Sequence, residues 1–491
     1  MAKNEVDLEK LTSWSSDWSQ IKVAVVGLGK TGFSVADTLN ELGSKLLVVA
    51  ESAAPETLDI LDVLGVECVI DQSPDALLRA MTSFGPDLVI VSPGVMPTSS
   101  IVEASKSLAI PIWTDVDLAW RLKDRFGDGQ EWICITGTNG KTTTTEITEA
   151  MLLASGVRAV ACGNIGKPIL DCIRDPAEFE VLVVELSSFQ LHYLDQIEPF
   201  SSAVLNVAHD HLDWHGGFEN YRIAKGRVYE NTKVACIYNL EDKATEELLQ
   251  AADVQEGARA IGFGLSAPTR STVGYVEDLL VDRAFLEERA DSALEIADLA
   301  DLAGFGVLTP HLLSNIAAAT ALARSYGVAP SHCRAALRSF SVSAHRIELV
   351  GEISGVRYIN DSKATNAHAA SASLRSFENV VWILGGLLKG VDISELIGQF
   401  GPGLRGAVVI GLDRAEIRGA FSLLAPKVPV VEIQEGDQVM KRAVSAASSL
   451  AQSGDVVLLA PAAASMDQFL NYQERGEIFR NAVMDLGGDR L

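Results

Sequence analysis

The sequence predicts an α/β protein made of three consecutive domains. Its 491 residues correspond to about three domains at roughly 150 residues per domain. Short runs rich in Val and Ile alternate with helix-length segments along most of the chain, which is typical of βαβ units and buried parallel sheets. The composition, with 48% hydrophobic and 21% charged residues, is that of a folded globular protein and argues against disorder.

The β-rich runs fall into three sets, one for each predicted domain. The strands of the first set are predicted at residues 21–26, 45–50, 87–91 and 110–113. Those of the second are predicted at 132–136, 181–185, 203–207 and 234–238, and those of the third at 380–384, 407–410, 428–433 and 456–460. Because strands that alternate with helices usually pair in parallel, we expect each set to form a sheet with helices on both faces.

Polar joints at residues 121–130 and 339–345 separate the three sets. The predicted domains are therefore residues 1–122, 123–341 and 342–491. The acidic segment 241–301 carries few motifs, and we expect it to be a solvated outer region of the second domain.

Charge and cysteine usage exclude several classes of protein. A net charge of −25 repels phosphate backbones, so nucleic-acid binding is not expected. No apolar run reaches the roughly 20 residues that span a bilayer, and the first twenty residues lack the apolar core of a secretory signal. The six cysteines lie far apart and are expected to be reduced. These features predict a cytoplasmic protein, and they do not exclude a small anionic substrate.

The strongest chemical signal is the segment GTNGKT at residues 137–142, between a predicted strand and a predicted helix that runs to about residue 155. Its glycines let backbone N–H groups approach a phosphate, and the helix N-terminus adds partial positive charge. In such loops the lysine reaches the β- and γ-phosphates and the hydroxyl binds Mg²⁺, roles that fall to Lys141 and Thr142. The residues expected to contact ATP here are Gly137, Thr138, Asn139, Gly140, Lys141, Thr142 and Thr143.

A second glycine loop, GLGKTG at residues 27–32, follows the first predicted strand and opens a helix. It satisfies the dinucleotide fingerprint G-x-G-x-x-G, and an acid, Glu51, lies near the end of the next strand. The pattern alone suggests NAD or FAD, but any nucleotide diphosphate can place its phosphates on a helix N-terminus. A packing role for these glycines, without a ligand, stays open.

Carboxylates and imidazoles follow two other strands of the second set. Glu185 ends one strand, and His209, His211 and His215 come just after the next. The carboxyl ends of parallel strands are where open sheets bind ligands, and a carboxylate suits Mg²⁺. The three histidines leave zinc as an alternative, although no cysteine lies nearby. Lys225 sits on a predicted helix, where the local pattern favours a solvated surface residue.

In the third domain, three predicted strands end in polar residues. The segments are NDSKATN at 360–366, LGGLLK at 384–389 and PAAASMDQF at 461–469. Because carboxyl ends of neighbouring parallel strands meet at one edge of a sheet, their convergence predicts a binding site.

In chain order, the motifs GTNGKTTTT, GNIG, ELSSFQL, LNVAHDHLD, YRIAKGRVY, NDSKATN and SMDQF resemble those of the Mur ligases. The resemblance covers nearly the whole chain, and the third-domain segments are similar to members that add D-glutamate to UDP-N-acetylmuramoyl-L-alanine in peptidoglycan synthesis. It implies a Rossmann-like N-terminal domain for the UDP substrate, a P-loop ATPase-like central domain and a Rossmann-like C-terminal domain for the amino acid. It also implies an ADP-forming ligase in which the substrate carboxylate takes the γ-phosphate as an acyl phosphate, which the amine of D-glutamate then attacks.

The resemblance assigns residue roles as well. Lys141, Thr142 and Glu185 would serve the phosphates and a first Mg²⁺, while His211 would bind a second Mg²⁺ with Lys225, which matches a carbamylated lysine of the family. Further contacts to ATP would come from Asn315, Arg346, Asp361 and Lys363. The UDP substrate would be held by Gly29, Lys30, Thr31, Glu51, Gly94, Asn164 and Ser187. D-Glutamate would be held by Thr365, Lys389, Ser465, Met466 and Tyr472.

Some positions depart from the family pattern. Ala50 stands where an Asp is expected for the uracil, which leaves Glu51 as a substitute. Leu312 replaces a common Asn, and Tyr472 replaces a Phe near D-glutamate. The leading residues 1–20, with two tryptophans, are longer than usual.

Three other functions remain as alternatives: a sibling ligase that takes another amino acid or a folate, an NAD-dependent oxidoreductase that uses residues 27–32, and an ATPase that couples hydrolysis to motion. The oxidoreductase leaves Lys141 and Thr142 unexplained. For the ligase we expect a monomer without nucleic-acid or membrane partners.

Overall fold

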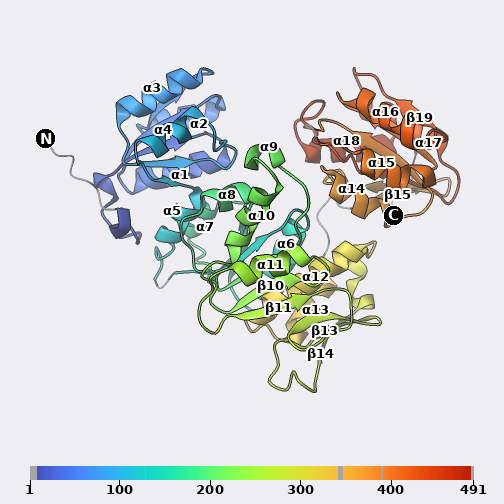
Figure 1. The fold of residues 1–491 in the computed structure, drawn as a ribbon, viewed down its shortest axis with the longest axis horizontal. Coiled ribbons are helices and arrows are strands. Elements are labelled where there is room, and N and C mark those ends of the chain that lie inside the picture. The colour runs from blue at the N-terminus through green and yellow to red at the C-terminus, as the bar shows by residue number, and fades with distance from the viewer. Residues whose placement is uncertain (1–7, 128, 341–346, 389–390, 488–491) are drawn as a thin grey trace. The chain divides into compact units, whose positions relative to one another are not determined.

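The computed structural model describes residues 8–127, 129–340, 347–388 and 391–487 (Figure 1). The chain divides into two compact units, which are described separately. The first comprises Met1–Asp301 with Ser314–Leu337, and the second Leu302–Leu313 with Arg338–Leu491. The first unit holds two sheets and the second holds one.

The first sheet has five parallel strands in the order β3-β2-β1-β4-β5. They are β1 (Lys22–Val26), β2 (Lys45–Ala50), β3 (Glu67–Ile70), β4 (Leu88–Val91) and β5 (Ile112–Trp113). The helices are α1 (Lys30–Glu41), α2 (Pro55–Val63), α3 (Pro74–Phe84), α4 (Ser100–Ser107) and α5 (Asp115–Leu122). The chain leaves β1 toward β2 on one side, whereas β4 lies on the other, so the carboxyl ends of β1 and β4 flank the crevice where such sheets bind ligands.

The second sheet has nine strands in the order β14-β13-β12-β11-β10-β9-β6-β8-β7. They are β6 (Glu131–Thr136), β7 (Ala159–Gly163), β8 (Val181–Glu185), β9 (Ser201–Val204), β10 (Ala235–Asn239), β11 (Arg259–Phe263), β12 (Thr272–Val276), β13 (Leu279–Asp282) and β14 (Leu294–Asp298). The helices here are α6 (Lys141–Ala154), α7 (Ile169–Ile173), α8 (Ser188–Tyr193), α9 (Leu212–His215), α10 (Phe218–Gly226), α11 (Lys243–Ala251), α12 (Pro310–Ser325) and α13 (Pro330–Ser339). Pairing is parallel except in the hairpins β12–β13 and β13–β14.

The interpretation of residues 241–301 as a solvated outer region was wrong in part. The segment contributes α11 and four strands to the sheet, and Ile261, Phe263, Val273 and Leu280 are buried. Glycines and acidic turns interrupt these short strands, so the sequence lacks the long apolar runs that marked the other strands. The strand predicted at 203–207 also ends early, at Val204, because the next residues leave the sheet toward the phosphate loop.

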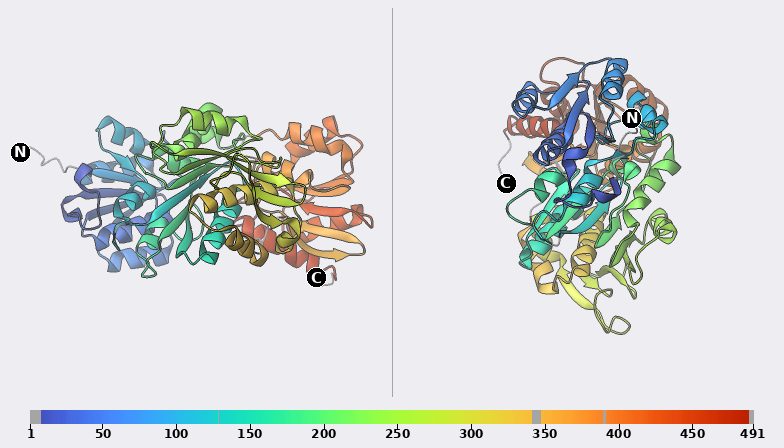
Figure 2. Two further views of the ribbon diagram at one scale, coloured as in Figure 1. Left: turned by 90° about the horizontal axis from the view of Figure 1, so that it is seen from below. Right: turned by 90° about the vertical axis from the view of Figure 1, so that its left-hand side faces the viewer.

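The third sheet has six strands in the order β15-β16-β20-β17-β18-β19. They are β15 (Glu348–Ile353), β16 (Val356–Asn360), β17 (Val380–Gly385), β18 (Gly406–Ile410), β19 (Val430–Glu432) and β20 (Val456–Leu459). The helices are α14 (Ala367–Leu374), α15 (Ser394–Phe400), α16 (Arg414–Leu424), α17 (Val439–Leu450) and α18 (Tyr472–Met484). All pairs are parallel except β15–β16, and separate core clusters around Trp382 and Phe479 cover the two faces, with helices on both sides (Figure 2).

The N-terminal segment packs on the joint between the first two sheets. Trp18 is buried in the core, and the Trp14 backbone N–H donates to Asp124 Oδ1 at 2.7 Å. The Arg125 guanidinium lies 4.1 Å from the centre of the Trp14 ring. Trp14 therefore braces residues 121–130, and Trp18 belongs to a core cluster that continues from the first sheet into the second. The domain boundaries at 122 and 341 remain predictions, and residues 341–346 lie outside the described part of the chain.

All six cysteines fall within the described residues, and all six are free thiols, as predicted. Within those residues no single helix is long and apolar enough to cross a membrane. The helices Leu299–Phe305 and Pro310–Ser325 are together long and apolar enough, but the chain bends sharply between them.

Candidate functional site

The phosphate loop joins β6 to α6 and requires glycine at two positions. Gly140 caps the helix with φ +82°, and a Cβ there would lie 2.3 Å from Asn315 Oδ1. A Cβ on Gly137 would lie 2.9 Å from the Leu205 Cβ. Neither position has room for a side chain, so the backbone can turn tightly from β6 into α6, as a phosphate loop requires. The helix ends at Ala154 and Gly156 follows with φ +89°, which confirms the predicted helix.

Side chains from other elements hold this loop in place. Asn206, just beyond β9, accepts from the Asn139 N–H at 2.8 Å and donates to the Asn139 carbonyl at 3.0 Å. The Thr138 hydroxyl lies 2.8 Å from the Tyr221 hydroxyl on α10. Two neighbouring elements therefore fix the backbone of the loop before any ligand binds, which is the preorganisation that phosphoryl transfer needs.

Two lysines donate to one carbonyl oxygen of the loop. Lys141 Nζ lies 2.8 Å from Gly137 O, and Lys225 Nζ lies 2.8 Å from the same atom. Lys225 is only 2% exposed, so the interpretation of a solvated surface residue was wrong. Burial, and then the charge of Lys141, hold the pKa of Lys225 well below its usual range, while the carboxylates of Asp210 and Glu185 act in the opposite direction.

Glu185 ends β8 beside the loop and is 2% exposed. Its Oε1 accepts from Asn164 Nδ2 at 2.9 Å, whereas its buried Oε2 has no hydrogen-bond partner among the described residues. An unpartnered buried carboxylate oxygen is costly, and a divalent cation would satisfy it. The residues present therefore fit a Mg²⁺ ion beside the phosphates, with the Thr142 hydroxyl as the other side-chain ligand from this loop.

The three histidines do not converge on one point. His211 is 42% exposed, has φ +50°, and lies edge-on to Phe189 with ring centres 4.6 Å apart. His209 packs on Phe218, and His215 Nε2 lies 3.0 Å from Ser188 Oγ. Within the described residues no group of three or more His, Cys, Asp or Glu could hold a metal. This counts against the zinc alternative and suits an Mg²⁺ held largely by phosphate oxygens.

Two residues expected to contact the substrate lie next to Glu185. The Asn164 N–H donates to the Glu185 carbonyl at 2.8 Å, in addition to the side-chain bond. Ser187 is the N-cap of α8 and forms a capping box with Gln190. The structure therefore brings together, at the carboxyl edge of the central sheet, the predicted residues Lys141, Glu185, Asn164, Ser187 and Lys225.

The N-terminal glycine loop also lies at the carboxyl edge of its sheet. Gly27 has φ +94°, and a Cβ on Gly32 would lie 2.0 Å from the Gly27 carbonyl oxygen. Gly29 caps α1, so Lys30 and Thr31 form its first turn. Gly94 lies in the loop after β4, on the other side of the crevice. Ala50, the last residue of β2, is buried, and Glu51 beyond it is exposed, so Glu51 is the acid available to a ligand at that strand end.

In the second unit backbone hydrogen bonds link the three polar strand ends, from the Ala462 N–H to the Ala364 carbonyl at 2.9 Å and from the Leu387 N–H to the Ala464 carbonyl at 3.0 Å. Asp361 accepts from the Ser373 hydroxyl and from the Ile347 N–H at 3.3 Å. The Lys363 ammonium lies 4.1 Å from the centre of the Tyr472 ring. The remaining predicted residues described here are Thr365, near Lys363, the buried Ser465 and the 63% exposed Met466. Arg346 and Lys389 lie outside the described residues.

Sequence reasoning missed Arg475, which joins two of these strand ends. Its guanidinium donates to Ser362 O at 2.9 Å, Ser362 Oγ at 3.0 Å and Ala463 O at 3.2 Å. Burial lowers its pKa to about 9. The available signal was a charged residue within the apolar stripe of α18, in step with Phe479 and Val483.

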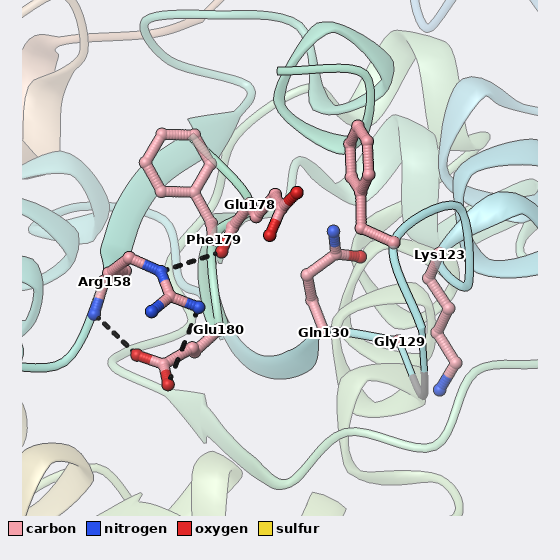
Figure 3. A pocket seen from close by; sticks show the side chains of 8 residues that line it. Lys123, Gly129, Gln130, Arg158, Glu178, Phe179 and Glu180 are labelled. Atoms are coloured by element: carbon pink, nitrogen blue, oxygen red, sulfur yellow. Dashed lines mark hydrogen bonds and ion pairs between the residues drawn. The ribbon is translucent and has the colours of Figure 1, made fainter. Parts of the chain in front are cut away.

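A separate pocket lies at the opposite, amino edge of the central sheet (Figure 3). Arg158 there donates to the Glu178 carbonyl at 3.0 Å and pairs with Glu180 at 3.8 Å. The other lining residues are Lys123, Phe126, Gly129, Gln130 and Phe179. Because the pocket precedes β6 and β8 whereas the phosphate loop follows β6, it is not part of the candidate site.

Comparisons with known proteins agree with this geometry. Residues 21–114 match the Mur ligase MurD-like N-terminal domain, residues 135–323 the Mur ligase middle domain, and residues 345–463 the Mur ligase glutamate ligase domain. A UDP-N-acetylmuramoylalanine–D-glutamate ligase from Leifsonia xyli is 51% identical over 99% of this chain and 97% of its own length. The protein of that name from Streptomyces coelicolor is 47% identical over 96% of this chain and 99% of its own length.

Solved structures show the same fold at low identity. A UDP-N-acetylmuramate–alanine ligase from Thermotoga maritima is 18% identical, with a TM-score of 0.56 over 95% of this chain and all of its own. A pseudomurein peptide ligase type C from Methanothermus fervidus is 15% identical, with a TM-score of 0.57 over the same shares. Together with the full-length relatives, these matches show that the chain belongs to the Mur ligase family.

Proposed function

We propose that this protein joins D-glutamate to UDP-N-acetylmuramoyl-L-alanine, with ATP converted to ADP and phosphate, in the synthesis of peptidoglycan precursors. The observation that carries the proposal is the phosphate loop with Lys141 at the start of α6, which lies at the same sheet edge as Glu185 because β6 pairs with β8. Full-length relatives of 51% and 47% identity bear the name of this reaction. The match of residues 345–463 to a glutamate ligase domain supports the choice of amino acid.

The chemistry requires two anions, the substrate carboxylate and the triphosphate, to approach each other. The N-terminus of α6 with its dipole and the Lys141 ammonium supply positive charge where the γ-phosphate is transferred. The carboxylate oxygen bonds to the γ-phosphorus while ADP leaves, which gives an acyl phosphate. The amine of D-glutamate then bonds to the carbonyl carbon, loses a proton, and expels phosphate as the amide forms.

We assign the Mg²⁺ ions to the same carboxyl edge of the central sheet. Ligases of this family use ATP and Mg²⁺, and a bound Mg²⁺ would neutralise charge on the transferred phosphate. Thr142 and Glu185 would hold a first ion, and His211 and Lys225 a second one. For the second ion, Lys225 would act as a carbamate. Burial beside Lys141 favours the neutral amine of Lys225, which is the form that adds CO₂ with loss of a proton. The resulting carbamate anion would face the Lys141 ammonium and the metal ion.

The three domains are assigned as UDP-substrate binding for residues 1–122, ATP binding for 123–341 and D-glutamate binding for 342–491. Gly29, Lys30 and Thr31 would take the UDP phosphates, since they open α1 at the sheet crevice. Asn315, which touches the phosphate loop, and Asp361 and Lys363 would complete the ATP contacts. We assign the protein to the cytoplasm as a monomer, without nucleic-acid or membrane partners.

The test is phosphate release from ATP with Mg²⁺, comparing reactions with and without UDP-N-acetylmuramoyl-L-alanine and with D-glutamate, L-glutamate, other amino acids or none. Release that needs both the nucleotide sugar and D-glutamate supports the proposal. Release with a different amino acid would keep the family reaction and overturn the choice of substrate. Release without any amino acid would indicate a simple ATPase, and tight NADH binding with no need for the nucleotide sugar would favour the oxidoreductase.

A further inference from the structure

The cavity at the amino edge of the central sheet, called here the amino-edge pocket, has no part in the proposed reaction. Its volume is about 120 Å³, close to the roughly 150 Å³ that holds a benzene ring in a protein core. The pocket precedes β6 and β8, whereas the phosphate loop and Glu185 lie at the other ends of those strands (Figure 3). A ligand of this pocket would therefore be bound apart from the nucleotide.

One buried polar atom in this pocket lacks a partner. Gln130 is 5% exposed, and its side-chain oxygen Oε1 has no hydrogen-bond partner among the described residues. Burying an amide oxygen without a hydrogen bond costs free energy. A ligand N–H that donates to Oε1 would remove this cost. Gln130 directly precedes β6, so the sheet fixes the position of its backbone.

The facing wall of the pocket carries a carboxylate. Figure 3 shows the side chain of Glu178 directed at the cavity, across from the Gln130 amide. In the described part of the chain this carboxylate forms no ion pair and accepts no hydrogen bond. Glu178 has φ +51°, a left-handed conformation that glycine adopts at lower cost. The chain therefore tolerates backbone strain at the residue that gives the pocket an unpaired negative charge.

The positive side chains that line the pocket already have partners. The Arg158 guanidinium lies 3.8 Å from a carboxylate oxygen of Glu180, and the Arg158 backbone N–H donates to the same carboxylate at 3.0 Å. The Lys123 ammonium lies 3.4 Å from the centre of the Trp120 ring, and burial lowers the pKa of Lys123. The charge of Glu178 is therefore left for a ligand.

The remaining lining favours an organic cation over other ligands. Phe126 and Phe179 line the pocket, and aromatic rings attract organic cations. The Phe126 ring already lies 5.3 Å from one such cation, the Arg125 guanidinium. One carboxylate and one amide oxygen would leave most of the coordination of a metal ion unfilled. An anion would be repelled by Glu178.

We propose that the amino-edge pocket binds a small organic cation that carries N–H donors, such as an amidinium, a guanidinium or a primary ammonium. Glu178 forms the ion pair, Gln130 Oε1 accepts one N–H, and the aromatic rings cover the apolar part of the ligand. The site does not depend on the proposed reaction.

Benzamidinium, benzamide and benzoate test the charge requirement, because the three have nearly the same shape and differ in charge. Isothermal titration calorimetry of the full chain should give an affinity for benzamidinium about tenfold or more above that for benzamide, since hydrogen bonds to charged groups are stronger than neutral ones. Benzoate should not bind. Equal affinities for the cation and the neutral amide, or no binding of benzamidinium up to about 10 mM, would overturn the proposal.

Three variants locate the site. Glu178→Gln, at an exposed position, keeps the size of the side chain and should lower the affinity for benzamidinium about tenfold without weakening benzamide. Gln130→Met removes the acceptor and should weaken both ligands. Glu131→Gln is the matched control, since it removes the same charge from the start of β6, but Glu131 pairs with Lys233 at 2.6 Å and does not line the pocket.

The titrations are made at about 0.1 M salt, which screens exposed charges more than roughly 10 Å apart, so the control should bind benzamidinium within about twofold of the unmodified chain. Equal losses in the two glutamate variants would show only a general attraction of cations to an acidic surface. Saturating ADP with Mg²⁺ should leave the affinity unchanged, and competition would place benzamidinium at the phosphate loop instead. Failure of the proposed reaction would be seen separately, as no substrate-dependent phosphate release.

Discussion

The two glycine loops of the first unit have similar sequences but are held in different ways. Both follow a buried parallel strand and open a helix, at residues 27–32 and 137–142. The N-terminal loop is held mainly by its own backbone, with Gly32 against the Gly27 carbonyl and one weak side-chain bond from Ser92 at 3.2 Å. The central loop is held from outside by Asn206 and Tyr221, and two lysine side-chain nitrogens donate to one of its carbonyls.

The difference shows what a glycine pattern can and cannot predict. Glycine spacing determines where a backbone can turn and approach a phosphate, and it is alike in the two loops. The side chains that add charge and rigidity come from distant segments, and they are abundant at one loop and sparse at the other. We therefore expect the central loop to carry the transfer chemistry and the N-terminal loop to bind a phosphate without reacting with it.

The largest difference should come from the lysines that follow the loops. Lys141→Ala should lower kcat on the order of 10³-fold, because it removes positive charge from the site of phosphate transfer. Lys30→Ala, at an exposed position, should mainly raise the KM for the nucleotide sugar. Steady-state phosphate release measures both, and near-normal turnover of Lys141→Ala would refute the phosphate assignment.

Lys225→Ala should cost on the order of 10²-fold or more in kcat, since it removes the expected metal-ligand anion. Short-chain carboxylates such as acetate should restore part of the activity, because they can occupy the space of the carbamate. Full activity without any additive would show that no carbamate is needed. The Lys30→Ala variant serves as control and should not respond to acetate.

Substitution of glycine should separate the two roles of the N-terminal loop. Gly32→Ala should lower the free energy of unfolding by about 2–4 kcal/mol, because the new methyl would lie 2.0 Å from a backbone oxygen. Gly29→Ala meets no atom within 4 Å, so stability should hold while the nucleotide-sugar KM rises. Denaturant unfolding and kinetics of both variants check this, and equal stabilities would contradict the close backbone approach.

The smallest difference should come from the side chains that brace each loop. Asn206→Ala removes the two hydrogen bonds that the Asn206 side chain makes with the N–H and carbonyl of Asn139, and it should cost about 1–3 kcal/mol of stability together with a loss in kcat. Ser92→Ala removes one long hydrogen bond and should cost less than about 1 kcal/mol. Thermal melting of the two variants compares them, and similar losses would mean that the two loops are braced alike.

Much of the fold could be predicted from local patterns. Runs of Val and Ile located most of the parallel strands, and GTNGKT located the phosphate loop with its helix. The short strands of residues 241–301 were missed because each is too brief and too often broken by glycine to differ from a loop. The local pattern favoured a solvated position for Lys225, which is in fact buried. The polar residues around it give no sign that the phosphate loop covers one face of their helix.

The sequence by itself determined the order of strands and helices, the positions that must be glycine and the family of the chain, because these depend on spacing between residues close in the chain. Only the tertiary structure decided that two lysines 84 positions apart share the Gly137 carbonyl, and that Glu185 Oε2 has no donor among the described residues. Those facts arise where parallel strands end side by side. Strand order in a sheet is set by packing of whole βαβ units, so the neighbours of a strand end are distant in sequence.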